Sequence, residues 1–246
     1  MNPHDEHMYF TSRRVAPLRI LRPCRPHRLG DRIWSEAMDT DRPAPGEELT
    51  AGPETAPRPA ATVIVLRGGA ERLQVLLVKR NPQTRFMGGA WVFPGGAVDR
   101  REGRGEPALH AAALRELREE AGIALSSPEE LIPFSRWITP AQVKIRFDTV
   151  FYLASLPPGA TERVDGSEVV DARWYAPREA LQAAGDGELF LVFPTIKHLE
   201  QLSGFRSAAE LIEHARGRDV RPVQPRVLLS GETARIVLPG EPGYED

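Results

Sequence analysis

Residues 115–120 read Arg-Glu-Leu-Arg-Glu-Glu and place three glutamates within five positions, Glu116, Glu119 and Glu120. On a helix, positions i, i+3 and i+4 share one face. Glu116 and Glu120 would then repel each other, at a cost of roughly 0.2–0.5 kcal/mol on an isolated helix. A divalent cation such as Mg²⁺ or Mn²⁺ would relieve that repulsion, because hard cations bind carboxylate oxygens. Taken alone, the stretch favours a solvated helix face with Arg–Glu pairs, so its surroundings must decide.

The surroundings predict a strand, a glycine loop and then this helix. The segment "AWVFPGG" (90–96) is typical of a short strand that ends in a Pro-Gly-Gly loop. Pro107 suits the first turn of a helix, and Ala, Leu, Arg and Glu dominate as far as Ala121. Gly122 suits the left-handed position that ends a helix. The glutamates are therefore expected on a helix with glycines before and after it.

This arrangement resembles the signature of Nudix hydrolases, G-x5-E-x7-R-E-U-x-E-E-x-G-U, in which U is a bulky aliphatic residue. The second half of the signature matches at every fixed position, which are Arg115, Glu116, Leu117, Glu119, Glu120, Gly122 and Ile123. The resemblance implies an α/β fold, the Nudix α/β/α sandwich with a mixed sheet. It also implies that the protein is an enzyme, a pyrophosphohydrolase.

The resemblance further implies roles for the residues of the signature. Glu116, Glu119 and Glu120 would be metal ligands, with the Gly95 carbonyl as another, for a Mg²⁺ or Mn²⁺ cofactor. Glu119 and Glu120 would also be catalytic, and Arg115 would orient a glutamate and balance charge. The metal would polarise the pyrophosphate and activate a water for attack on phosphorus.

The first half of the signature departs from the pattern. The family places a glutamate eight residues before the arginine, and here that position is Pro107, with Glu106 one residue further back. The loop from Gly96 to Arg115 is also about five residues longer than the pattern. Asp99 and Glu106 are the two candidates for the first-half acid, and the sequence leaves the choice open.

A fourth acid lies outside this box. Many Nudix proteins carry a glutamate for metal binding or catalysis shortly before a strand that contains tryptophan, and here Glu168 precedes Trp174. The resemblance makes Glu168 a candidate catalytic residue. Asp171 competes for the same role, and a plain loop acid is the alternative.

A second motif lies upstream, in residues 76–96. Coenzyme A diphosphatases of the superfamily carry L-L-T-x-R-[SA]-x3-R-x3-G-x3-F-P-G-G before the box. Val78 replaces the Thr and Asn81 replaces the Ser or Ala, while the other positions match: Leu76, Leu77, Arg80, Arg85, Gly89, Phe93, Pro94, Gly95 and Gly96. Arg80, Arg85 and Phe93 are therefore candidate substrate-binding residues, because arginines can grip phosphates. The alternative is that Arg80 ends a strand at the surface and Arg85 is a loop charge.

The two motifs together predict metal-dependent hydrolysis of the pyrophosphate bond of a nucleoside diphosphate linked to another moiety. Coenzyme A or acyl-coenzyme A is the preferred substrate, giving adenosine 3′,5′-bisphosphate and a phosphopantetheine product. One alternative is a pyrophosphatase for NADH, ADP-ribose or nucleotide sugars, which the missing Thr keeps open. Another is a non-catalytic Nudix ligand sensor. Such sensors commonly lose box glutamates, and this chain keeps those of the second half.

The whole chain of 246 residues divides into three parts. Residues 1–59 are expected to be a disordered arm, because residues 1–60 hold nine of the 23 prolines and few apolar clusters. An alternative is that translation starts at Met38, after the arginine-rich part of the arm. Residues 60–190 are expected to form the Nudix domain, with strands at 61–67, 73–80, 131–139, 147–156 and 169–175. Residues 191–246 are expected to be a helical extension packed on it.

Composition limits the partners. The formal net charge is −2, so nothing favours nucleic acid, and no apolar run is long enough to span a membrane. With one cysteine, Cys24, an intrachain disulfide is impossible. We expect a cytoplasmic monomer or homodimer that binds a small nucleotide.

Overall fold

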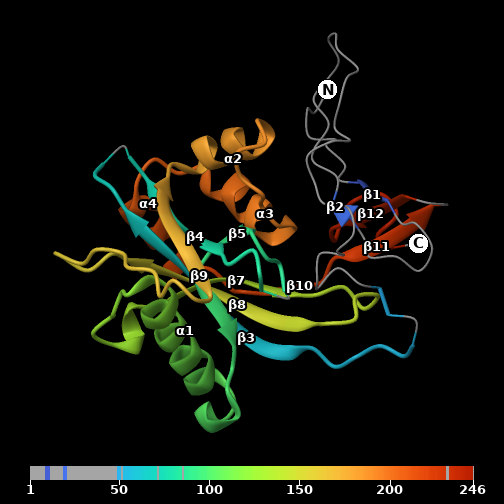
Figure 1. Cartoon of the computed structure of the whole chain (residues 1–246), viewed down its shortest axis with the longest axis horizontal. Helices are drawn as coiled ribbons and strands as arrows, with labels where there is room; N and C mark the ends of the chain where they lie inside the picture. The colour runs from blue at the N-terminus through green and yellow to red at the C-terminus, as the bar shows by residue number, and fades with distance from the viewer. Residues whose placement is uncertain are drawn as a thin grey trace.

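The computed structural model describes residues 9–11, 19–20, 49–50, 52–70, 72–84, 86–230 and 233–245. A mixed sheet lies at its centre, with helices on both faces (Figure 1). Along the sheet the strand order is β10-β7-β8-β3-β4-β5, with β6 added beside β3 and β9 beside β4. The pairs β3–β8 and β10–β7 are parallel and the others are antiparallel. The strands are β3 (Arg58–Arg67), β4 (Gln74–Arg80), β5 (Trp91–Val92), β6 (Gly95–Ala97), β7 (Ile132–Ile138), β8 (Phe147–Ser155), β9 (Val169–Tyr175) and β10 (Pro222–Val223).

Each face of this sheet has its own hydrophobic core. Helix α1 (Glu106–Ala121) covers one face, where Ala112, Ala113 and Leu117 pack on strand residues such as Val63 and Leu76. The other face carries α2 (Pro177–Gly185), α3 (Phe193–Leu202) and α4 (Ala208–Arg216). Figure 1 shows α1 on one side of the sheet and α2 and α3 on the other. This layering confirms the expected α/β/α sandwich.

Helix α1 spans the predicted residues and ends at the predicted glycine. Gly122 has φ 67°, in the left-handed region, and its N–H donates to the Arg118 carbonyl at 3.0 Å. The side chains of Ala108, Ala112 and Ala113 are buried, and such small residues let a helix backbone lie close to a sheet. The box residues are thus fixed on a helix that packs closely against the sheet.

The segment 90–96, predicted as a short strand that ends in a Pro-Gly-Gly loop, contains one short strand and the start of a second, because the two glycines begin a strand of their own. β5 ends at Val92 and β6 begins at Gly95, with Phe93 and Pro94 between them. Proline has no N–H to give to a ladder, so the chain leaves one partner there and joins another. β5 pairs with β4, whereas β6 pairs with β3.

The C-terminal segment is helical only in part. The predicted helices are present as α3 and α4, but after Arg216 the chain forms β10, then β11 (Arg226–Ser230) and β12 (Thr233–Val237). β10 exists because it pairs in parallel with β7, a partner more than 80 residues away that helical periodicity cannot reveal. β11 and β12 belong to a second, four-stranded sheet, whose other strands are β1 (Tyr9–Thr11) and β2 (Arg19–Ile20), in the order β11-β12-β1-β2.

Two strands of that second sheet come from the N-terminal arm. They are β1 (Tyr9–Thr11), which pairs with β12, and β2 (Arg19–Ile20), which pairs with β1. The rest of residues 1–48, including Met38 and Cys24, lies outside the described residues. Within the part of the chain that the structure describes, no helix is both long enough and apolar enough to cross a bilayer.

Short 3₁₀ turns complete the connections. One, η1 (Arg100–Glu102), lies between β6 and α1, and the other, η2 (Pro128–Glu130), precedes β7. Asp99 caps η1 by accepting the N–H of Arg101 at 2.8 Å, and the Glu102 carboxylate accepts the Asp99 N–H at 2.6 Å. The turn therefore fixes the position of Glu102 relative to the glycines of β6.

Candidate active site

Helix α1 turns one carboxylate into the protein. Its buried residues are small or apolar apart from Glu120, whose exposure is 3%. The Glu120 carboxylate accepts the N–H of Gly95 on β6 at 2.9 Å, and Arg80 at the end of β4 lies 3.6 Å from it. A buried charge must be paired or hydrogen-bonded, and these two contacts meet that need. They also bring the upstream motif and the box to one place.

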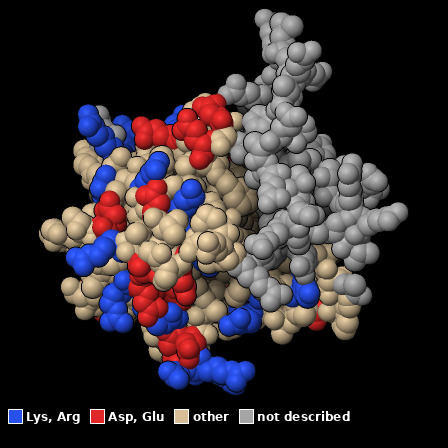
Figure 2. Space-filling model, in the orientation of Figure 1, with Lys and Arg blue, Asp and Glu red and all other residues tan. Residues whose placement is uncertain are grey.

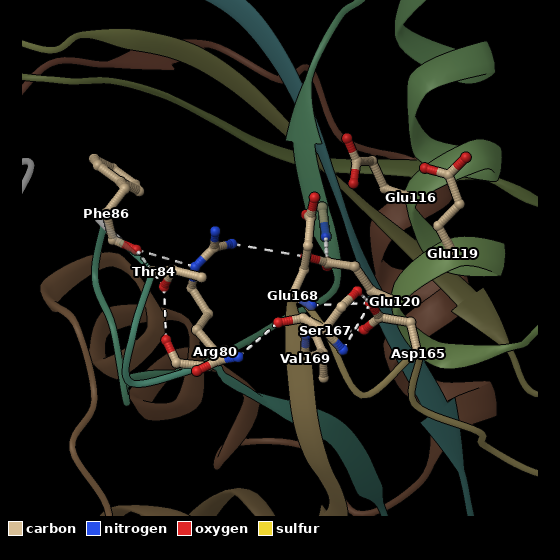
Figure 3. Close-up of polar contacts among 12 residues, drawn as sticks. Arg80, Thr84, Phe86, Glu116, Glu119, Glu120, Asp165, Ser167, Glu168 and Val169 are labelled. Atoms are coloured by element: carbon tan, nitrogen blue, oxygen red, sulfur yellow. Dashed lines mark hydrogen bonds and ion pairs between the residues drawn. The ribbon is translucent and has the colours of Figure 1, made fainter.

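Glu116 lies one turn earlier and packs against the glycine loop. A Cβ added at Gly96 would stand 2.2 Å from the Glu116 Oε1, so only glycine leaves room for this carboxylate. Glu119 projects from the same region but is more exposed, at 54% of its side chain. Figure 3 shows Glu116 and Glu119 pointing outward from α1, with Glu120 lower and directed toward Arg80.

Arg115 ties the outer part of the cluster together. Its guanidinium donates to Glu116 at 2.7 Å, to Glu119 at 3.2 Å and to the Ala97 carbonyl at 3.1 Å. Its Nε donates to Glu102 at 2.8 Å. The Glu102 hydrogen bond is the largest effect on the pKa of Arg115, which lies above its ordinary value. The arginine thus contacts three glutamates, Glu102, Glu116 and Glu119.

In the first half of the box, Arg115 contacts Glu102. This residue is neither of the two candidates from the sequence, Asp99 and Glu106. Asp99 caps η1, and Glu106 is 74% exposed and lies 3.9 Å from His110. Counting forward from Gly96, with five residues between, leads directly to Glu102, which was the available signal. The extra residues lie after Glu102, where Gly103 and Gly105 turn the chain at φ 87° and 77°.

Glu168 enters the cluster from the opposite side, just before β9. Figure 3 shows it between Arg80 and the carboxylates of α1. Burial is the largest cause of the raised pKa of Glu116 and of Glu120, and the charge of Glu168 adds to it in both cases. Asp171, the rival acid, instead pairs with Arg173 at 2.9 Å. Of these two candidates, Glu168 is the one that interacts electrostatically with Glu116 and Glu120.

Burial sets the electrostatics of the cluster. It is the largest cause that raises the pKa of Glu120 to about 7, against the lowering effects of the Gly95 N–H and Arg80. Burial also raises the pKa of Glu116, more than its hydrogen bond to Arg115 lowers it. Figure 2 shows acidic side chains gathered on the surface around α1, with basic side chains beside them. The site gathers more negative charge than Arg80 and Arg115 balance.

That excess bears on whether the residues fit a metal ion. Within the described ranges, no three His, Cys, Asp or Glu side chains converge closely enough to form a metal centre as they stand. Arg115 instead engages Glu116 and Glu119, and Arg80 lies beside Glu120. The donors are all oxygens, the type that Mg²⁺ and Mn²⁺ prefer, and the negative charge is partly uncompensated. By donor chemistry and charge, the cluster fits a hard divalent cation.

The predicted substrate-binding residues have different fates. Arg80 lies at the cluster, and Arg85 falls outside the described residues. Phe93 does not line the site: it is 3% exposed in the core beneath α3, and its ring packs edge-to-face on His198 with centroids 6.2 Å apart. An aromatic side chain in that position serves packing, so we assign Phe93 to the core.

Comparisons with known proteins find relatives of one family. A Caenorhabditis elegans protein named as a nudix hydrolase is 28% identical over 180 residues, which span 59% of this chain and 60% of that protein. Acyl-coenzyme A diphosphatase NUDT19 of Homo sapiens is 24% identical, over 80% of this chain and 78% of that protein. The crystal structure of a NUDIX hydrolase from Alicyclobacillus acidocaldarius superposes with a TM-score of 0.58 at 29% identity, covering 65% of this chain and 96% of that one.

A family model completes the case. The model of the NUDIX domain matches residues 56–194, more than half of the chain and the segment that holds the carboxylate cluster, Arg115 and Glu168. Nudix hydrolases use divalent metal ions, in keeping with the charge of this cluster. Because the fold, the box and the family model coincide on the same residues, the chain belongs to the Nudix family and is a Nudix pyrophosphohydrolase.

Proposed function

We propose that the protein hydrolyses the pyrophosphate bond of coenzyme A or an acyl-coenzyme A, with Mg²⁺ or Mn²⁺ as the metal. The observation that carries the proposal is the meeting of two motifs at Glu120. The box supplies the carboxylate, and Arg80 of the upstream motif lies 3.6 Å from it. Two relatives named acyl-coenzyme A diphosphatase, from Homo sapiens and Gallus gallus, each match more than three quarters of the chain and support this substrate class.

The residues divide the work of an in-line hydrolysis. Glu116, Glu119 and Glu120, with the Gly95 carbonyl, would hold the cation, which when bound neutralises charge on the diphosphate oxygens. Glu168 takes a proton from the attacking water, whose oxygen forms the new bond to phosphorus. The bridging P–O bond breaks, and the leaving oxygen keeps its electron pair. Glu102 and Arg115 keep Glu116 oriented during the reaction.

Arg80 is assigned to the diphosphate. A guanidinium this close to Glu120 is too near the carboxylates to serve a distant part of a nucleotide, and it suits a phosphate oxygen. Its Nε is fixed by the Phe86 carbonyl at 3.2 Å, so the side chain is oriented before substrate arrives. We therefore expect Arg80→Ala to slow the hydrolysis of coenzyme A and of 3′-dephospho-coenzyme A to the same extent.

The second candidate is a pyrophosphatase for NADH, ADP-ribose or nucleotide sugars. Val78 and Asn81 depart from the coenzyme A motif, and this departure favours it. A ligand sensor without activity is disfavoured, since Glu102 joins the intact second half of the box in the arrangement around Arg115.

The test is a substrate panel on the purified protein, with products identified by mass spectrometry. We expect coenzyme A to give adenosine 3′,5′-bisphosphate in Mg²⁺ or Mn²⁺, EDTA to abolish turnover, and the metal to restore it. Glu120→Gln should lower kcat about a hundredfold or more, because a proposed metal ligand loses its charge and metal-ion catalysis contributes several kcal/mol. Glu213→Gln, a matched change on the exposed face of α4, should not. Faster hydrolysis of NADH or ADP-ribose would transfer the assignment to the second candidate, and no turnover of any substrate would favour the sensor.

A further inference from the structure

The segment that delivers Glu168 is held by Asp165. The Asp165 carboxylate accepts the backbone N–H groups of Ser167 at 3.0 Å, Glu168 at 2.9 Å and Val169 at 2.9 Å, as well as the Ser167 hydroxyl. Burial would raise the pKa of Asp165, but these hydrogen bonds outweigh it and lower the pKa to about 2. One ionised side chain thus fixes the backbone of three consecutive residues, with Glu168 in the middle (Figure 3).

The same segment is tied to the loop of Arg80 through Asn81. The Asn81 backbone N–H donates to the Glu168 carbonyl at 2.8 Å, and its side-chain amide donates to the Ser167 carbonyl at 2.8 Å. On its own side, the Asn81 Oδ1 accepts the N–H of Gln83 at 2.9 Å. Ser167 lies 86 positions away in the chain, so Asn81 joins two loops that only the fold brings together.

The strand register shows why this fixation is needed. β4 and β9 pair regularly as far as Lys79 with Asp171, and then Arg80 pairs with Val169, which leaves Val170 as an extra residue. Val170 is 39% exposed, whereas Val169 is fully buried under α1. A bulge of this kind redirects side chains and gives up ladder hydrogen bonds, so the segment beyond it needs other partners. Asp165 and Asn81 are those partners.

We propose that Asp165 and Asn81 are positioning residues that hold Glu168 against the carboxylates of α1, with Asn81 coupling the Glu168 segment to the loop of Arg80. The inference rests on the proposed role of Glu168 in hydrolysis. It gives a function to Asn81, one of the two residues that depart from the coenzyme A motif. An ordinary Ser or Ala there has no amide to reach the Ser167 carbonyl.

The test is a double-mutant cycle on the full chain, with coenzyme A or the best substrate of the panel. Asn81→Ala and Asp165→Ala should each lower kcat about ten- to a hundredfold with KM within about twofold, since a small misplacement of a catalytic group has such effects. Combined with Glu168→Gln, which is itself slow, either change should lower kcat by less than about twofold more, because residues that act through one group are not additive.

Conservative variants separate positioning from loop stability. Asn81→Asp keeps the acceptor for Gln83 but has no donor for Ser167, so it should be as slow as Asn81→Ala. Asp165→Asn is isosteric and keeps one acceptor, so it should recover part of the rate lost in Asp165→Ala even if the latter folds poorly. Ser207→Ala removes a matched side-chain cap from α4, far from the site, and should leave kcat unchanged.

The outcomes distinguish failure of the positioning role from failure of the proposed role of Glu168 in hydrolysis. Full turnover in Glu168→Gln would refute the role of Glu168 and the positioning role with it. If Glu168→Gln is slow but Asn81→Ala and Asp165→Ala reduce kcat equally in both backgrounds, the positioning role alone is overturned. Wild-type turnover in Asn81→Asp would overturn the bridge between the loops.

Discussion

At the scale of single residues, the site is organised by arginines that compensate carboxylates. Arg115 contacts Glu102, Glu116 and Glu119, and Arg80 reaches Glu120. Such a network holds several carboxylates close together although they repel one another, and it leaves them oriented for a cation. Among these carboxylates, Glu102 has the largest effect on the pKa of Arg115. It accepts a hydrogen bond from the Arg115 Nε, and its side chain is only 12% exposed.

The first prediction follows from that contact. Glu102→Gln removes the charge that fixes Arg115, so kcat should fall about tenfold or more, in line with the strength of a charge-assisted hydrogen bond. Glu106→Gln is the matched control, since this exposed glutamate is four residues away and was a rival for the same role. Steady-state kinetics on both variants decides between them. Equal losses, or a loss only in Glu106→Gln, would contradict the assignment of Glu102.

At the scale of elements, β6 is the part that brings helix and sheet together. It pairs with β3, donates the Gly95 N–H to Glu120, and leaves space beside Gly96 for Glu116. The two glycines face different neighbours. A Cβ on Gly95 would meet the backbone of Ala61 and Thr62 at 2.6 Å, whereas a Cβ on Gly96 would meet the end of the Glu116 side chain.

The second prediction uses this difference. Gly96→Ala should displace the Glu116 carboxylate and lower kcat at least tenfold, with a melting temperature close to that of the wild type, because a side-chain end can move. Gly95→Ala should lower the melting temperature by several degrees, since backbone on β3 must shift, an overpacking cost of about 1–3 kcal/mol. Gly69→Ala, where nothing lies within 4 Å, is the control. The reverse pattern of losses would show that β6 does not act as described.

At the scale of the whole molecule, α3 is attached to the sheet through a buried histidine. His198 on α3 is 1% exposed and lies over Phe151, with ring centroids 4.1 Å apart. Its Nδ1 lies 2.6 Å from the Pro194 carbonyl, which can only accept, so Nδ1 carries the proton. Nε2 then accepts from the Ser135 hydroxyl at 2.6 Å. Burial is the main cause that lowers the pKa of His198 to about 4.

The third prediction concerns stability at acid pH. Between about pH 6.5 and pH 4 the unfolded state binds a proton at His198 that the folded state does not, so the free energy of unfolding falls as pH falls. The shift amounts to about 3 kcal/mol at most by pH 4. Urea unfolding of the wild type and His198→Gln across this range measures it, because the glutamine does not titrate. The variant should be less stable at pH 7 and lose less on acidification; equal losses would rule out a buried neutral histidine.

Sequence alone determined the parts of the site that lie within a few turns of one another. Pro107 and the run of Ala, Leu, Arg and Glu after it predicted one helix, Gly122 predicted its end, and the resemblance supplied the fold around it. These inferences succeeded because helix geometry is local: residues three and four apart must be neighbours whatever the rest of the chain does. The central strands β3 and β4 were predictable from a different local pattern. Each contains a continuous aliphatic run, which is typical of a strand buried on both faces.

Only the tertiary structure decided the rest. It placed Phe93 in the core and brought Asn81 to Ser167 across 86 positions. It also made strands of the segment after Arg216, by pairing β10 with β7. Each of these outcomes depends on strand register, loop path or side-chain direction across the sheet. Contacts between distant segments are set by how the layers pack as a whole, and no local pattern of residues contains that information.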